Sequence, residues 1–112
     1  MYMVPPFLAY FAADKGDAGL LQESVRQCRL YREILRTPVN SPCKGAWRHI
    51  IGPQSQDEGC WSTGNAWAAG GMARVLATVQ KAPVAQNTTW KDELGGEISG
   101  YIKEILDAAI AS

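Results

Sequence analysis

Apolar residues recur at three- and four-residue steps along most of this chain, which is the spacing of one face of an α-helix. The clearest stripe lies within about 18–36 and consists of Leu21, Val25, Cys28, Tyr31 and Leu35. Another lies within about 89–111 and consists of Leu94, Ile98, Tyr101, Ile105 and Ala108. We predict four helices in antiparallel pairs, over 3–13, 18–36, 65–80 and 89–111, and no strand. The predicted fold class is all-α, with residues 1–112 as a single domain.

The first and second predicted helices differ in their polar faces. The helix at 3–13 is entered through two prolines, which a first turn tolerates. Its large side chains leave almost no polar face, so we expect burial on most sides: Phe7, Leu8, Tyr10 and Phe11. Asp17 would cap the second helix. On that helix Glu23 and Arg26, and Arg29 and Glu33, stand at spacings that allow ion pairs, which predicts a solvated charged face.

The third predicted helix is built from very small residues, with alanines at 66, 68, 69 and 73 and glycines at 70 and 71. Each glycine costs roughly 1 kcal/mol of helix propensity relative to alanine, so such a helix usually has a packing reason. We therefore predict an inner helix, closely approached by other backbones. Asn65 is a good candidate for its N-cap, and Trp61 and Trp67 would rim its N-terminal end.

Residues 37–62 show no sustained period and are long for a plain connector, and loops of this length are commonly functional or disordered. The segment 44–51 is too apolar and aromatic for disorder, so we predict an ordered functional loop. It contains His49, the single histidine of the chain. Ala82-Pro83 would end the third helix.

Composition excludes several function classes. Eleven basic and eleven acidic residues balance to zero net charge, with no basic stripe for nucleic acid. No apolar run approaches the roughly 20 residues of a membrane span, and the N-terminus lacks the basic region of a secretory signal, which leaves localisation open. The triplet at Asn87 matches a glycosylation acceptor, relevant only in a secreted chain.

The three cysteines give an odd count without a CxxC pair, which argues against a metal site. A disulfide between Cys43 and Cys60 is conceivable. Cys28 stands at helical spacing with Val25 and Tyr31, which favours a buried thiol.

The aromatic residues around the third helix suggest a ligand site. Trp47, Trp61 and Trp67 have indole faces suited to stacking on a sugar ring, and His49 can donate to an anion or transfer a proton. The helix N-terminal amides can hold a carboxylate. The alternative interpretation is that the tryptophans fill the core and His49 is an ordinary loop residue. Spacing alone names no reaction, since no Ser/His/Asp set, paired carboxylates or phosphate loop is visible.

Three ordered motifs carry a family resemblance: the segment 2–10 (YMVPPFLAY), the segment 44–49 (KGAWRH) and the segment 61–67 (WSTGNAW). The chain resembles the six-hairpin glycosidases of glycoside hydrolase families 88 and 105, the unsaturated glucuronyl and rhamnogalacturonyl hydrolases, and is most similar to the fungal cell-wall type. The resemblance spans nearly all of this chain and about a third of a full family member.

The resemblance implies two helical hairpins of an incomplete (α/α)6 toroid and hydration of a 4,5-unsaturated uronic acid at the end of a pectin fragment, with no metal or organic cofactor. It implies that His49 corresponds to the family's pocket histidine and Trp67 to the aromatic of a Gly-Asn-Gly-Trp motif. Trp61, Gly64 and Asn65 occupy the rest of that motif. Thr63 stands where relatives often carry an arginine, so one carboxylate clamp is missing.

The resemblance also implies a loss of activity. The family's proton-donating aspartate precedes the segment that matches Tyr2-Met3, and Asp14 and Asp17 flank a turn at the far end of the first helix. We therefore expect no catalytic residue in this chain and impaired turnover. Unpaired hairpins leave apolar faces to cover, so we expect a homo-oligomer that can bind a uronic-acid oligosaccharide. The alternative is a non-enzymatic helical binding or self-associating protein, such as a secreted fungal effector.

Overall fold

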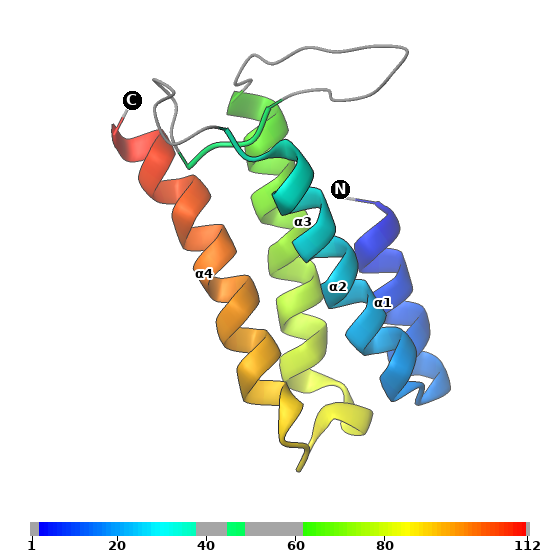
Figure 1. Ribbon diagram of the computed structural model, residues 1–112. Coiled ribbons are helices and arrows are strands. Elements are labelled where there is room, and N and C mark those ends of the chain that lie inside the picture. The colour runs from blue at the N-terminus through cyan, green and yellow to red at the C-terminus, as the bar shows by residue number, and fades with distance from the viewer. Residues whose placement is uncertain (1–2, 38–44, 49–61, 112) are drawn as a thin grey trace.

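The computed structural model describes residues 3–37, 45–48 and 62–111, which form four α-helices (Figure 1). These are α1 (Val4–Lys15), α2 (Ala18–Leu35), α3 (Ser62–Lys81) and α4 (Trp90–Ala111), with one 3₁₀ turn at Pro83–Ala85. The described residues contain no strand, only an isolated antiparallel bridge between Arg36 and Trp47. The predicted all-α class is confirmed.

The turns between the helices follow from local chemistry. Gly16 ends α1 in the left-handed conformation at φ 67°, which glycine adopts without steric cost. Asp17 then caps α2, as predicted, because its Oδ1 accepts a hydrogen bond from the Leu20 amide at 3.0 Å. Pro83 follows the end of α3 and opens the 3₁₀ turn, so the predicted break at Ala82-Pro83 is also confirmed.

α3 is the inner helix of the four, as its small residues predicted. It packs against α1, α2 and α4, and Figure 1 shows it between α4 and the pair formed by α1 and α2. Its buried hydrophobic side chains are Ala68, Ala69, Met72, Val75 and Val79. They meet Leu21 and Val25 of α2 and Ile98 and Ile105 of α4 in one hydrophobic core.

The structure contradicts the predicted burial of the first helix. Phe7 is 62% exposed, Phe11 45% and Tyr10 44%, whereas Ala9 and Ala12 are fully buried. The physical reason is the edge position of α1, which touches α2 and α3 on one side and nothing described here on the other (Figure 1). A small-residue face suits the close contact, and the large side chains are left outside.

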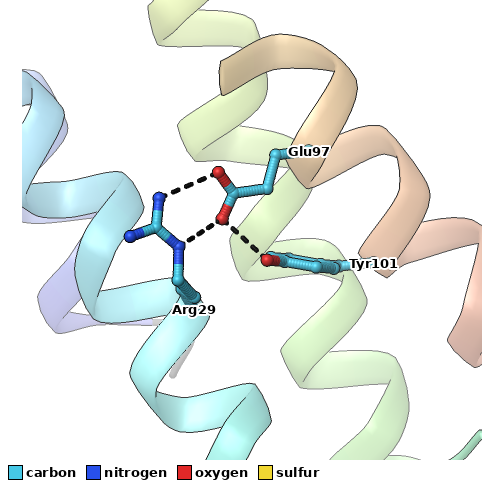
Figure 2. A network of polar contacts seen from close by, with 3 residues as sticks. All are labelled: Arg29, Glu97 and Tyr101. Atoms are coloured by element: carbon cyan, nitrogen blue, oxygen red, sulfur yellow. Dashed lines mark hydrogen bonds and ion pairs between the residues drawn. The ribbon is translucent and has the colours of Figure 1, made fainter. Parts of the chain in front are cut away.

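Two bidentate ion pairs join α2 to α4. The Arg29 guanidinium donates to the Glu97 carboxylate at 2.7 and 2.9 Å, and the Tyr101 hydroxyl donates to the same carboxylate at 2.7 Å (Figure 2). Three residues further along α2, Arg32 donates to Glu104 at 2.8 and 3.1 Å. The Arg32 guanidinium also lies 4.7 Å from the centre of the Tyr101 ring, within cation–π range.

These pairs correct part of the charge prediction. Glu23 and Arg26 do pair at 2.9 Å on the surface of α2. Arg29 pairs with Glu97 rather than with Glu33, so the helix face that carries Arg29 contacts α4, with the Arg29 side chain still 40% exposed. Bidentate geometry between two packed helices outcompetes a flexible pair within one helix.

Cys28 is fully buried, as predicted, and burial raises the pKa of its thiol to about 12. The conceivable disulfide between Cys43 and Cys60 lies outside the described residues. None of the described helices combines the length and the apolar character needed to cross a membrane.

Removing one methyl group should cost stability in the core and nothing at the surface. Ile98 is fully buried against α3, whereas Ile110 of the same helix is 83% exposed. We expect Ile98→Val to lower the free energy of unfolding by about 1 kcal/mol and Ile110→Val to change it by less than about 0.5 kcal/mol. Urea unfolding followed by circular dichroism measures both, and equal effects would contradict the described core.

The Glu97 ion pair should make stability depend on acid pH. The Arg29 hydrogen bonds hold the pKa of Glu97 below its usual range, so folding favours the charged carboxylate. This contribution is present above the pKa of an unfolded glutamate, about 4.3, and is lost as the pH falls through the lower folded value. We expect Glu97→Gln to destabilise the protein by about 1 kcal/mol at pH 7, since the Arg29 side chain is 40% exposed and screened.

The matched control is Glu33→Gln. Glu33 lies four residues after Arg29 on α2, and Arg29 pairs with Glu97 instead. We expect urea unfolding to show a smaller difference in free energy of unfolding between the parent protein and Glu97→Gln at about pH 3, below the glutamate pKa, than at neutral pH. An effect of Glu33→Gln equal to that of Glu97→Gln would contradict the interhelical pair.

Candidate functional site

The candidate site is the end of the bundle where α2 ends and α3 begins. Here the chain leaves α2 through Arg36 and Thr37 and returns at residues 45–48, beside the N-terminal part of α3 (Figure 1). The Thr37 amide donates to the Ala46 carbonyl at 3.0 Å, and the Arg48 amide donates to the Leu35 carbonyl at 2.6 Å. These two hydrogen bonds pair residues 35–37 with residues 46–48 at the base of the predicted functional loop, and we call the segment 45–48 the loop base.

The Asn65 side chain joins this loop base to α3. Its Oδ1 accepts from the Trp47 amide at 2.6 Å, and its Nδ2 donates to the Trp47 carbonyl at 3.1 Å. One carboxamide therefore satisfies both backbone groups of Trp47, as a neighbouring β-strand would. Asn65 is 9% exposed, so the donor and the acceptor are both used away from bulk water.

This geometry corrects the predicted N-cap. α3 begins at Ser62, so Asn65 lies inside the helix and not at its boundary. An N-cap oxygen accepts from the amides of its own helix, whereas the Asn65 oxygen accepts from Trp47, eighteen residues earlier. An asparagine side chain can either cap its own helix or bind the backbone of another segment. The position of Trp47 beside α3 decides that Asn65 does the latter.

α4 supports the same loop base from the other side. Gly45 has φ 92°, a left-handed conformation that favours glycine. A Cβ at this position would lie 3.2 Å from the Ala108 Cβ and 3.2 Å from the Glu104 carbonyl oxygen. Glycine is therefore required at residue 45 both by the turn and by the close approach of the C-terminal part of α4.

The predicted site residues divide into separate groups. The Trp47 indole is buried at 3% exposure in the hydrophobic core, and its Nε1 has no hydrogen-bond partner among the described residues. Trp67 is 51% exposed. Asn65 and Trp67 are two residues apart, about 200° around a helix, so they point to nearly opposite sides of α3. The structure thus unites Asn65 with Trp47 and separates both from the Trp67 indole.

The other predicted site residues are placed only in part. Thr63 and Gly64 belong to the first turn of α3, whereas His49 and Trp61 lie outside the described residues. Sugar binding by these residues stays a prediction. Among the described residues, no group of three or more His, Cys, Asp or Glu is gathered as a metal site would require.

The sequence interpretation missed the part played by the end of α2. Leu35 and Thr37 bind residues 46–48 through backbone hydrogen bonds, and such bonds cannot be predicted from the spacing of side chains along the sequence. The available signal was local: Gly45 before the strand-prone Trp47 is typical of a turn that leads into an extended segment.

Comparison with known proteins adds one finding to this geometry. The model of the family described as Glycosyl Hydrolase Family 88 matches residues 1–107 of the chain. No match was found among curated proteins or among solved structures.

We expect removal of the Asn65 carboxamide to weaken the attachment of the loop base to α3 while the helices remain folded. Asn65→Ala leaves the Trp47 amide and carbonyl without their side-chain partner in a buried place, which we expect to cost about 2 kcal/mol of unfolding free energy. Hydrogen exchange read by NMR should show faster exchange of the Trp47 amide.

The control is Gln80→Ala, an amide removed from an exposed position of the same helix. It should leave the Trp47 amide protected and the stability nearly unchanged. Unaltered Trp47 exchange in Asn65→Ala would contradict the two hydrogen bonds.

Proposed function

Because this chain belongs to glycosyl hydrolase family 88, we propose that it is a piece of an unsaturated uronyl hydrolase that retains part of a sugar-binding pocket. The observation that carries the proposal is the family match over residues 1–107, which spans almost the whole chain. The proposed ligand is a pectin-derived oligosaccharide that ends in a 4,5-unsaturated uronic acid, most similar to those used by the fungal cell-wall type of the family.

The arrangement of the helices supports this proposal. α1 and α2 form one antiparallel pair and α3 and α4 another (Figure 1), and the proposal assigns these pairs to two hairpins of an (α/α)6 toroid. In such a toroid the ends of the inner helices open onto the ligand. The described structure provides an ordered helix end of this kind, with Asn65 holding the loop base against α3.

We propose that Trp67 supplies the apolar contact to the sugar ring. Its indole is 51% exposed near the start of α3, so it can stack on a ring without any rearrangement of the core. Trp47 has a different part, since its buried ring anchors the loop that leads into His49. His49 and Trp61 complete the pocket in this proposal, on the strength of the family motif alone.

Turnover by this chain is proposed to be slow. Asp14 and Asp17 lie at the C-terminal end of α1, opposite the Asn65 end of the bundle (Figure 1). The α4 carboxylates nearer the Asn65 end are engaged, Glu104 by Arg32 and Asp107 by Lys103 at 2.6 Å. Because none of these four described carboxylates is a free general acid at the Asn65 end, we expect a rate about 10²–10⁴ below that of a complete enzyme.

Isothermal titration calorimetry with an unsaturated galacturonyl–rhamnose disaccharide tests the proposal. We expect saturable binding that Trp67→Ala weakens by about fivefold or more, since stacking of an aromatic ring contributes about 1 kcal/mol. Calorimetry is preferable to tryptophan fluorescence here because the substitution removes a reporter group.

The matched control is Ile110→Ala, another exposed apolar side chain, at the C-terminal end of α4. It should leave the affinity unchanged. Heat that does not saturate with the parent protein, or equal weakening by both substitutions, would overturn the proposed pocket. The ultraviolet absorbance of the conjugated uronyl group, followed in the same mixtures, reports turnover separately.

A second candidate function is a self-associating helical module without catalysis. The exposed apolar side chains of α1, such as Phe7 and Phe11, favour it.

A further inference from the structure

The last turn of α2 contacts α4 and the loop base at the same time. On its α4 side, Arg32 donates to the Glu104 carboxylate at 2.8 and 3.1 Å. On its loop side, the Leu35 carbonyl accepts from the Arg48 amide at 2.6 Å, and the Ile34 carbonyl accepts from the Arg48 guanidinium at 2.6 Å. The loop base therefore binds two of the carbonyl groups that the end of a helix leaves without an intrahelical partner.

Glu104 contacts both the loop base and α2. A Cβ on Gly45 would lie 3.2 Å from the Glu104 carbonyl oxygen and 3.7 Å from the Glu104 Cγ, so the backbone of residue 45 lies directly on this residue of α4. The carboxylate of the same residue is held by Arg32. A single α4 residue thus touches the loop base with its backbone and Cγ and the end of α2 with its carboxylate.

The Arg29–Glu97 pair provides a comparison for the Arg32–Glu104 pair. Both pairs join α2 to α4 with bidentate geometry, and their side chains have similar exposure, 40% and 19% in the first pair and 18% and 34% in the second. Glu97 lies seven residues before Glu104, about 10 Å along the axis of α4 and away from the Gly45 contact. The two pairs are alike in joining the helices and differ in their distance from the loop base.

We propose that Arg32 and Glu104 are positioning residues of the pocket. Their ion pair fixes the end of α2 against α4 where both helices contact the loop base, and it thereby sets the place of residues 45–48. A bidentate pair suits this task because it fixes direction as well as distance. His49 follows the loop base in the chain, so the effect of the pair on ligand binding rests on the proposed function. Neither positioning residue contacts the ligand in this proposal.

Amide hydrogen exchange read by NMR compares Glu104→Gln with Glu97→Gln, two substitutions that keep the shape of the side chain and remove its charge. The exchange rates are taken relative to the Ile98 amide in the core of α4, which corrects for a change in global stability. We expect Glu104→Gln to accelerate the Arg48 and Thr37 amides about fivefold or more, which corresponds to about 1 kcal/mol. Glu97→Gln should change these relative rates less than about twofold.

A charge swap adds a readout that a loss of packing cannot produce. Arg32→Glu places two carboxylates opposite each other and should accelerate the same amides. Adding Glu104→Arg to this variant rebuilds an ion pair with reversed signs, so the double variant should recover most of the lost protection.

Calorimetry with the unsaturated galacturonyl–rhamnose disaccharide tests the connection to the pocket. We expect Glu104→Gln to weaken binding about threefold or more and Glu97→Gln to leave it unchanged, although both lower the free energy of unfolding. Unchanged binding by Glu104→Gln would overturn its part in the pocket. A parent protein that does not bind the disaccharide would refute the proposed function, and the exchange comparison would still decide whether the pair sets the loop base.

Three exchange results would overturn the proposal. These are equal acceleration by Glu97→Gln and Glu104→Gln, unaltered exchange of the Arg48 and Thr37 amides in Glu104→Gln, and a charge-swapped protein that exchanges as fast as Arg32→Glu alone. The first would mean that both ion pairs only join the helices.

Discussion

The close approach of three helices to α3 is the constraint on which the rest of this structure depends. Ala68 and Ala69 of α3 are buried against its neighbours, and Met72, Val75 and Val79 fill the core without exposure. Because protein interiors are packed as densely as organic crystals, this inner helix fixes where α1, α2 and α4 can lie. Larger residues at Ala68 or Ala69 would separate the helices and open the core.

In addition to this packing around α3, polar groups set the relative positions of its neighbours. α2 and α4 meet through Arg29 with Glu97 (Figure 2) and through Arg32 with Glu104. Tyr101 contacts both pairs, since its hydroxyl donates to Glu97 and its ring lies 4.7 Å from the Arg32 guanidinium. Such partly exposed pairs contribute modestly to stability but strongly to geometry, since a bidentate pair tolerates little sliding of one helix along the other. The C-terminal part of α4 is thereby held beside Gly45.

The candidate site is built on this frame by a single side chain. Asn65 belongs to the rigid inner helix, and its carboxamide holds the backbone of Trp47 through two hydrogen bonds. Residues 45–48, which directly precede His49 in the chain, are therefore positioned by the core. A binding site placed on a loop is useful only if a rigid element fixes the loop, and α3 supplies that element.

The sequence by itself determined the four helices, their turns and the inner place of α3. Periodicity, the Asp17 cap, Gly16 and Pro83 are local signals, because each acts within a few residues of the chain. The three ordered motifs also indicated the family, which the match over residues 1–107 then supported. Residues within one helix turn interact whatever the rest of the chain does, so these features could be read in advance.

Only the tertiary structure decided what each side chain does. Arg29 had two acidic partners to choose from, Asn65 could cap its own helix or hold a distant loop, and Phe7 could be buried or exposed. Each outcome depends on which helix or loop lies next to the side chain in the folded protein, and the spacing of residues along the chain does not specify that neighbour. Composition alone predicted that the large apolar side chains of α1 would be buried. The structure instead buries its small residues, because close packing against α2 and α3 leaves no room for larger side chains.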